Sequence, residues 1–164
     1  DYEYILGDIR AKVLVLSSDL LSFFDAHLAT HSNLSQVIVV GHEPGPHLSM
    51  GDLMARASKT FQTVDTKLDD ICFWLYTSGT TGTPKGAVHL HSHLIQTADL
   101  YAVPTLGVKA EDVVFSAAKL FFAYGLGNAL TFPFSVGATT VLLEGVPTPG
   151  AVSDILQQLS LIHI

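Results

Sequence analysis

Short apolar runs rich in β-branched residues recur along this chain of 164 residues, and they constrain its fold more than any other feature. Val13–Leu16, Val37–Val40 and Ile71–Tyr76 are each long enough for one buried strand. The residues around these runs repeat their apolar side chains at helical spacing, which predicts helices over 2–11, 20–30 and 49–58. Because strands alternate with helices, the chain is expected to be α/β, with a parallel or mixed sheet flanked by helices.

The second half of the chain continues the alternation. The pattern predicts strands over 86–90, 112–115 and 138–143, and helices over 91–101 and 150–159. The aromatic stretch 120–135, which contains Gly125 and Gly127, is assigned no element.

A loop rich in glycine and hydroxyl residues follows the third run: Thr77-Ser-Gly-Thr-Thr-Gly-Thr-Pro-Lys-Gly86. Glycine adopts backbone conformations closed to other residues and lets N–H groups approach an anion closely. Successive N–H groups in such a turn form a concave anion site, to which the hydroxyls add donors and Lys85 adds a positive charge. The loop therefore predicts a site for the phosphates of a nucleotide. The alternative is a flexible connection between two hairpin strands.

The loop differs from the P-loop pattern G-x-x-x-x-G-K-[ST] at two positions. Counted from Gly79, Pro84 stands where the second glycine belongs and Gly86 stands where Ser or Thr belongs. These mismatches argue against the P-loop NTPases.

The loop resembles the signature motif of the adenylate-forming superfamily, which includes acyl-CoA synthetases, peptide-synthetase adenylation domains and luciferases. In that family the loop closes over the ATP phosphates while a carboxylate attacks the α-phosphate, giving an acyl-adenylate and pyrophosphate. The resemblance implies that the nucleotide-binding residues are Thr77, Ser78, Gly79, Thr80, Thr81, Gly82, Thr83 and Lys85. It implies a catalytic role for Lys85, which would steady the loop or its charge.

A second segment, Lys119-Leu-Phe-Phe-Ala-Tyr-Gly-Leu-Gly-Asn128, resembles the aryl-substrate region of benzoate–CoA ligases. In that group an Ala-Tyr pair lines the benzoate ring, which implies that Ala123, Tyr124 and Gly125 bind substrate. Taken alone, the aromatic residues here also fit ordinary core packing. Lys119 is expected to be solvated or salt-bridged. The resemblance implies an aromatic carboxylate, ATP with Mg²⁺, and CoA as co-substrate.

Composition limits the partners. The net charge is −7, with 8 basic and 15 acidic residues, which does not suit a nucleic-acid binder. No apolar run reaches the roughly 18–20 residues that cross a bilayer, so no membrane partner is expected. The lone Cys72 fits a reducing cytosol, and the expected location is cytoplasmic.

Three alternating histidines, His89, His91 and His93, would share one face of a strand and could bind zinc there. The spacing is unlike that of a structural zinc site, and no metal site is predicted.

The family's magnesium-binding glutamate, ribose-binding aspartate and C-terminal lysine have no counterpart in this sequence. We therefore expect residues 1–160 to be part of an AMP-binding (adenylation) domain truncated at both ends, followed by an unmatched tail, 161–164. The expected parent is an aryl-CoA ligase of the acid–thiol ligase class, with the chain alone inactive. Another acyl-CoA synthetase, a carrier-protein adenylation domain and an inactive truncated nucleotide-binding module are the alternatives.

Overall fold

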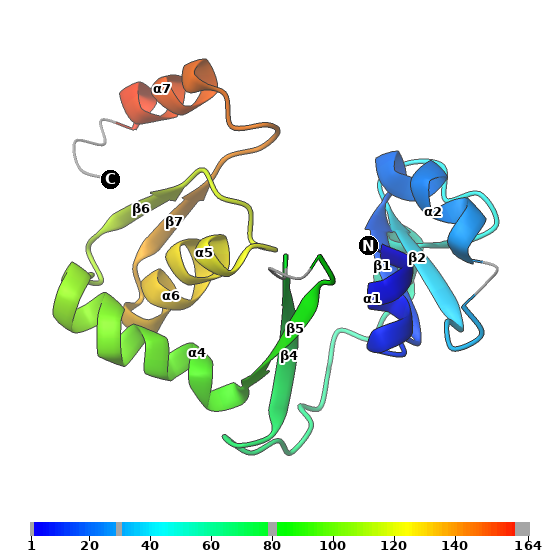
Figure 1. The fold of residues 1–164 in the computed structure, drawn as a ribbon. Coiled ribbons are helices and arrows are strands. Elements are labelled where there is room, and N and C mark those ends of the chain that lie inside the picture. The colour runs from blue at the N-terminus through cyan, green and yellow to red at the C-terminus, as the bar shows by residue number, and fades with distance from the viewer. Residues whose placement is uncertain (1, 29–30, 79–81, 160–164) are drawn as a thin grey trace. The chain divides into compact units, whose positions relative to one another are not determined.

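A computed structural model of the chain describes residues 2–28, 31–78 and 82–159. The described part has the expected mixed α/β fold, with helices beside small parallel and antiparallel sheets (Figure 1). The chain divides into two units: one holds Asp1–Val64 and Ser78–Lys85, the other Asp65–Thr77 and Gly86–Ile164.

The first unit is built on a three-stranded parallel sheet in the order β1-β2-β3. Its elements are α1 (Tyr2–Asp8), β1 (Val13–Ser17), the 3-10 helix η1 (Ser18–Leu20), α2 (Leu21–Leu28), β2 (Gln36–Val40), β3 (Leu48–Ser49) and α3 (Met50–Arg56). In the register of β1 and β2, Val13 pairs with Gln36 and Ser17 with Val40. The two-residue strand β3 was not predicted, because it is too short to show any alternation of side chains.

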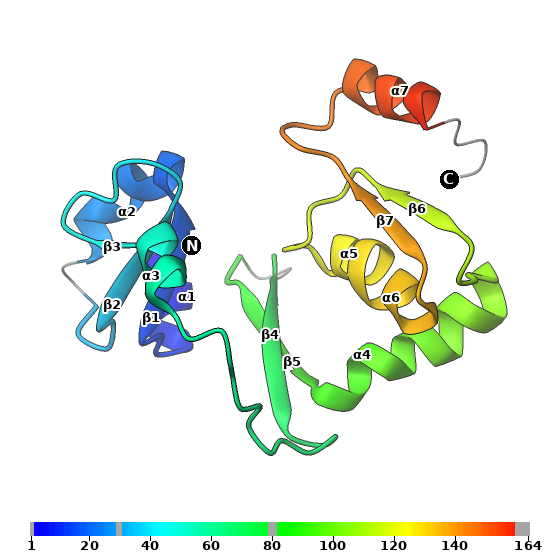
Figure 2. The ribbon, with the colours of Figure 1, turned by 180° about the vertical axis from the view of Figure 1, so that it is seen from behind.

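One face of this sheet carries the core of the unit. The buried cluster consists of Leu6, Leu16, Phe24, Val37 and Val39. On β1 the alternate residues Val13 and Val15 are 47% and 50% exposed, so they lie on the opposite face. Helix α3 contacts β2 and β3 (Figure 2).

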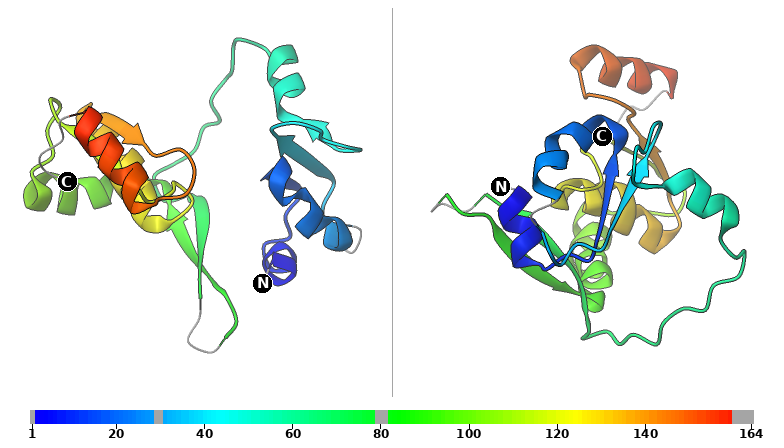
Figure 3. Two further views of the ribbon diagram at one scale, coloured as in Figure 1. Left: turned by 90° about the horizontal axis from the view of Figure 1, so that it is seen from above. Right: turned by 90° about the vertical axis from the view of Figure 1, so that its right-hand side faces the viewer.

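Two strands bracket the glycine-rich loop, and all of their residues except Lys85 fall in the second unit. Strands β4 (Ile71–Thr77) and β5 (Lys85–Leu90) form a two-stranded sheet, which Figure 3 shows as a ribbon. The seven-residue connection 78–84 is too short for a parallel crossover, so the pair is an antiparallel hairpin. Strand β5 begins at Lys85, one residue earlier than predicted.

A parallel pair of strands and a group of helices complete the second unit. The elements are α4 (His91–Thr97), the π-helix η2 (Ala98–Leu106), β6 (Val113–Ser116), α5 (Ala123–Leu126), the π-helix η3 (Gly127–Thr131), α6 (Phe132–Val136), β7 (Thr139–Leu142) and α7 (Pro149–Gln158). Strands β6 and β7 pair from Val113 with Thr139 to Ser116 with Leu142. Helices η3 and α6 contact β7, and η3 also contacts β6.

The stretch 120–135, to which no element was assigned, is largely helical in the structure. Two glycines and Pro133 interrupt its side-chain pattern, and both discourage a helix prediction. Helix α4 continues through η2 to Leu106, beyond the predicted end at 101. None of the described helices has the length and hydrophobicity to span a membrane.

Candidate functional site

The glycine-rich loop joins two strands and presents polar groups to solvent. Thr77 ends β4, Lys85 begins β5, and both side chains are exposed. Ser78 and Thr83 are exposed between them. Hydroxyl groups and a cation are therefore accessible on one short connection, as a site for a polyphosphate requires. The predicted contacts from Gly79, Thr80 and Thr81 lie outside the described residues.

The structure gives a different reason for glycine at each of two positions of the loop. Gly82 has φ +87°, a left-handed conformation that other residues rarely adopt, which agrees with a tight turn. Gly86 lies on β5 opposite Tyr76 on β4, and a Cβ at Gly86 would come 3.1 Å from Cζ of the tyrosine ring. A side chain at 86 would therefore need the Tyr76 ring to shift by a few tenths of an ångström, so the packing of the hairpin favours glycine here.

The three histidines do not lie on one strand. His89 is on β5, whereas His91 and His93 belong to the first turn of α4. The His89 ring stacks on Phe73 of β4 with centroids 4.9 Å apart and planes at 12°. His93 meets His89 edge-on at 5.6 Å. A zinc site on one face of a strand would need all three histidines on that strand. These described residues do not have that arrangement.

His93 also has a structural role at the start of α4. Its Nδ1 accepts a hydrogen bond from the backbone N–H of Leu90 at 3.3 Å. The next two N–H groups, of His91 and Ser92, donate to the carbonyls of Asp70 and Leu68 at 3.1 and 2.9 Å. The strand-to-helix junction after the loop is thereby hydrogen-bonded at consecutive residues.

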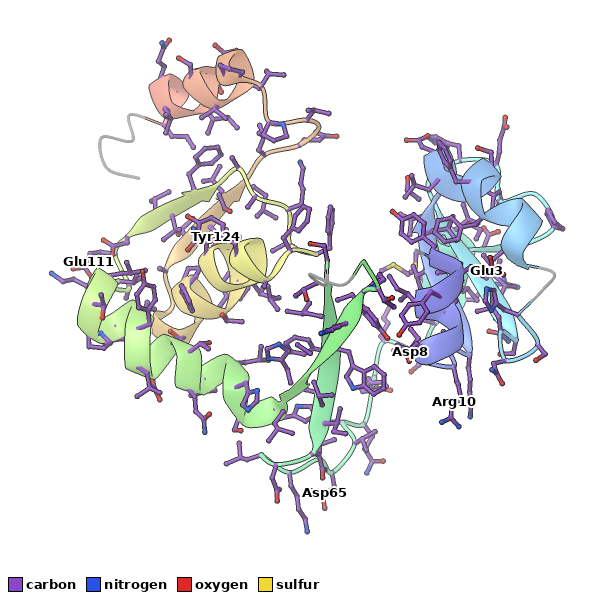
Figure 4. All side chains as sticks on the ribbon, viewed as in Figure 1. Glu3, Asp8, Arg10, Asp65, Glu111 and Tyr124 are labelled. Atoms are coloured by element: carbon purple, nitrogen blue, oxygen red, sulfur yellow. The ribbon has the colours of Figure 1, made fainter. Side chains whose placement is uncertain are left out.

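The predicted substrate residues Ala123 and Tyr124 open helix α5 (Figure 4). Both are exposed, and Tyr124 is 71% exposed. Tyr124 is therefore no core residue of the described part, contrary to the packing alternative. Its ring is accessible to a ligand.

Gly125 is buried, and its close neighbours are backbone atoms of the chain itself. A Cβ at this position would collide with the Lys119 carbonyl oxygen, and would come 2.7 Å from the Lys119 carbonyl carbon and 2.9 Å from the Ala118 oxygen. The side of Gly125 that a side chain would occupy is thus filled by the chain's own backbone.

Two features near this segment were not foreseen. Lys119 donates a hydrogen bond from Nζ to the Leu143 carbonyl oxygen at 2.6 Å, in place of the solvated or salt-bridged side chain that was expected. A groove of about 440 Å³ is lined by His89, His93, Gln96, Thr97, Leu100, Tyr101 and Phe132. Neither the hydrogen bond nor the groove could be predicted from residue spacing, because each is formed by residues from separate elements.

Of the described loop residues, Ser78 and 82–85 fall in the first unit, whereas Thr77 and Gly86 fall in the second, as do Ala123–Gly125.

Comparison with known proteins identifies the class to which this loop and fold belong. A family model described as AMP-binding enzyme matches residues 1–163, and the chain belongs to this family. Among curated relatives, the chain is 52% identical over 158 residues to a benzoate–CoA ligase of Thauera aromatica, covering 96% of this chain and 30% of that protein. A 4-hydroxybenzoate–CoA/benzoate–CoA ligase of Rhodopseudomonas palustris is 44% identical over 156 residues, covering 95% of this chain and 29% of that protein.

A solved structure of an enzyme with a similar sequence has the same fold over this region. The crystal structure of the anthranilate CoA ligase AuaEII in complex with anthranoyl-AMP matches with a TM-score of 0.86 and 35% identity. The match covers 98% of this chain and 31% of that one. The chain thus spans just under a third of the length of the relatives that it matches.

Proposed function

We propose that this chain is part of an aryl-CoA ligase that joins benzoate or a hydroxybenzoate to CoA at the expense of ATP. Residues 1–160 would form part of its adenylation domain, and the rest of the site would come from other parts of the parent protein. The observation that carries the proposal is the hairpin loop with exposed hydroxyls, Lys85 and the left-handed Gly82, in a chain 52% identical to a benzoate–CoA ligase.

The proposed reaction has two steps. A carboxylate oxygen of the aromatic acid attacks the α-phosphorus of ATP, the bond to the bridging oxygen breaks, and pyrophosphate leaves. The CoA thiol, losing its proton, then attacks the carbonyl carbon of the acyl-adenylate and releases AMP. Both steps are group transfers without a redox change.

In the first step the loop would hold the β- and γ-phosphates. Negative charge grows on pyrophosphate as the bond breaks, and fixed donors placed around that charge lower the barrier. Ser78 and Thr83 supply hydroxyl donors, and Lys85 supplies a positive charge. Thr77 and Gly82 are proposed to bind the phosphates with them, as are Gly79, Thr80 and Thr81.

Mg²⁺ would neutralise part of the phosphate charge when bound. Its carboxylate ligand is proposed to come from outside this chain, as are the groups that hold the ribose and CoA. The proposed cytoplasmic location rests on the lone Cys72.

The aromatic ring would lie against Ala123 and Tyr124. Alanine leaves room for a flat ring, and the accessible face of Tyr124 offers an apolar wall. This assignment rests on the resemblance to the aryl-substrate region and on the exposure of both side chains.

The test is ATP–pyrophosphate exchange by the full-length parent with a panel of acids. We expect exchange with benzoate or a hydroxybenzoate, and aryl-CoA formation when CoA is added. Good exchange with acetate or a fatty acid, and none with any aromatic acid, would refute the aryl assignment and leave the family intact. The 164-residue chain alone is expected to show no exchange; turnover by it would refute the claim that the site needs further parts.

A further inference from the structure

The Lys119 side chain connects two strand ends that lie far apart in the sequence. Its Nζ donates to the Leu143 carbonyl oxygen at 2.6 Å, and the bond is partly buried. Leu143 directly follows β7, and Lys119 lies in the connection that follows β6, the parallel neighbour of β7. A charge-assisted bond of this length is among the stronger hydrogen bonds of a protein.

The backbone of Lys119 supports the start of α5. Its carbonyl accepts from the Phe122 N–H at 3.1 Å, and the Phe122 carbonyl accepts from the Leu126 N–H at 2.8 Å. The same Lys119 carbonyl fills the space beside Gly125 where a Cβ would lie. Helix α5 therefore begins directly against the residue whose side chain is bonded to the end of β7.

Among the described residues, Tyr124 is held mainly through its backbone. Its side chain is 71% exposed, and Ala123 is also exposed. The position of both side chains consequently follows from the backbone of α5, which is held at its start through Lys119 and at its end by its continuation into η3, a helix that contacts β6 and β7.

We propose that Lys119 is a positioning residue for the aromatic acid: its bond to the Leu143 carbonyl fixes the β6–α5 connection and thereby the wall made by Ala123 and Tyr124. This inference rests on the proposed aryl-CoA ligase function. Loss of the bond lets the connection move, so the aromatic acid is bound less well while the loop that holds ATP keeps its structure.

The experiment measures KM for benzoate and for ATP in the full-length parent carrying Lys119→Met, which keeps the apolar stem and removes the donor. We expect KM for benzoate to rise about tenfold and KM for ATP to change by less than about twofold. Lys119→Arg, which keeps charge and donors, should stay within about threefold of wild type for benzoate. Lys109→Met is the matched control, because Lys109 is exposed beside the start of β6, and it should leave both constants unchanged.

Three results overturn the assignment: an unchanged KM for benzoate in K119M, equal rises in both constants, or a folded K119R that matches K119M. If K119M does not fold, Lys119→Leu, which also lacks a donor, replaces it under the same criteria. A wild-type parent without exchange on any aromatic acid overturns the proposed function and this inference together, whereas an active wild type with an unaffected K119M overturns this inference alone.

Discussion

At the scale of single residues, the structure gives different reasons for glycines that look alike in the sequence. Gly82 has a left-handed backbone, Gly86 lies under the ring of Tyr76, and Gly125 lies against the backbone of residues 118–119. Only the first reason follows from the composition of the loop. The other two depend on which neighbours the fold brings close.

Gly125→Ala should be strongly destabilising. The new methyl group would meet the Ala118 oxygen at 2.9 Å and the Lys119 carbonyl still more closely, and backbone cannot rotate away as a side chain can. We expect a loss of about 1–3 kcal/mol in the free energy of unfolding of the parent, measured by urea denaturation. Gly150→Ala is the control, because nothing lies within 4 Å of its Cβ position in α7, and it should be neutral or stabilising. Equal stabilities of the two variants would contradict the close packing at Gly125.

At the scale of elements, the histidines considered above as zinc ligands lie at the junction between β5 and α4, where His93 helps to start the helix. The strand ends at Leu90, and the chain turns into a helix whose first N–H groups find acceptors in His93, Asp70 and Leu68. Free N–H groups at a helix start need such partners. The histidine at the third helical position takes the role that Glu or Gln has in a capping box.

His93→Ala should therefore weaken this junction by about 1 kcal/mol, because the Leu90 N–H loses its acceptor. His93→Gln restores an acceptor at the same position and should recover most of the stability. Thermal unfolding of the full-length parent, followed by circular dichroism, provides the comparison. A Gln variant as unstable as the Ala variant would show that the imidazole acts through its contact with His89 instead.

At the scale of the whole molecule, the first sheet has one face packed and one apolar face open to solvent among the described residues. Val13, Val15 and Val40 are 44–50% exposed, whereas the buried core lies on the opposite face. Parallel sheets are normally covered on both faces. The share of the relatives' length that this chain spans, about 30%, leaves ample sequence elsewhere in those proteins to provide such a cover.

Expressed alone, the 164-residue chain should aggregate and bind the dye ANS, because large apolar faces attract other chains. The double variant V13T/V15T keeps β-branched side chains while making this face more polar, and it should reduce both aggregation and dye binding. Leu14→Thr is the control, since Leu14 packs against the core and its loss should worsen both. A monomeric wild-type chain with a sharp cooperative melt and no dye binding would disprove the expectation.

The sequence alone predicts the α/β class and most strands to within a residue or two, and it also predicts that the loop at 77–86 binds phosphate. These features can be predicted because each depends on residues that are adjacent in the chain. A buried strand shows as an apolar run, and the loop shows as glycines beside hydroxyl residues and Lys85. The tertiary structure alone decided the helices within 120–135, the packing reasons for Gly86 and Gly125, and the bond from Lys119 to Leu143. These depend on contacts between residues far apart in the chain, where the free energy of a packed or hydrogen-bonded pair overrides local preference and leaves no local pattern.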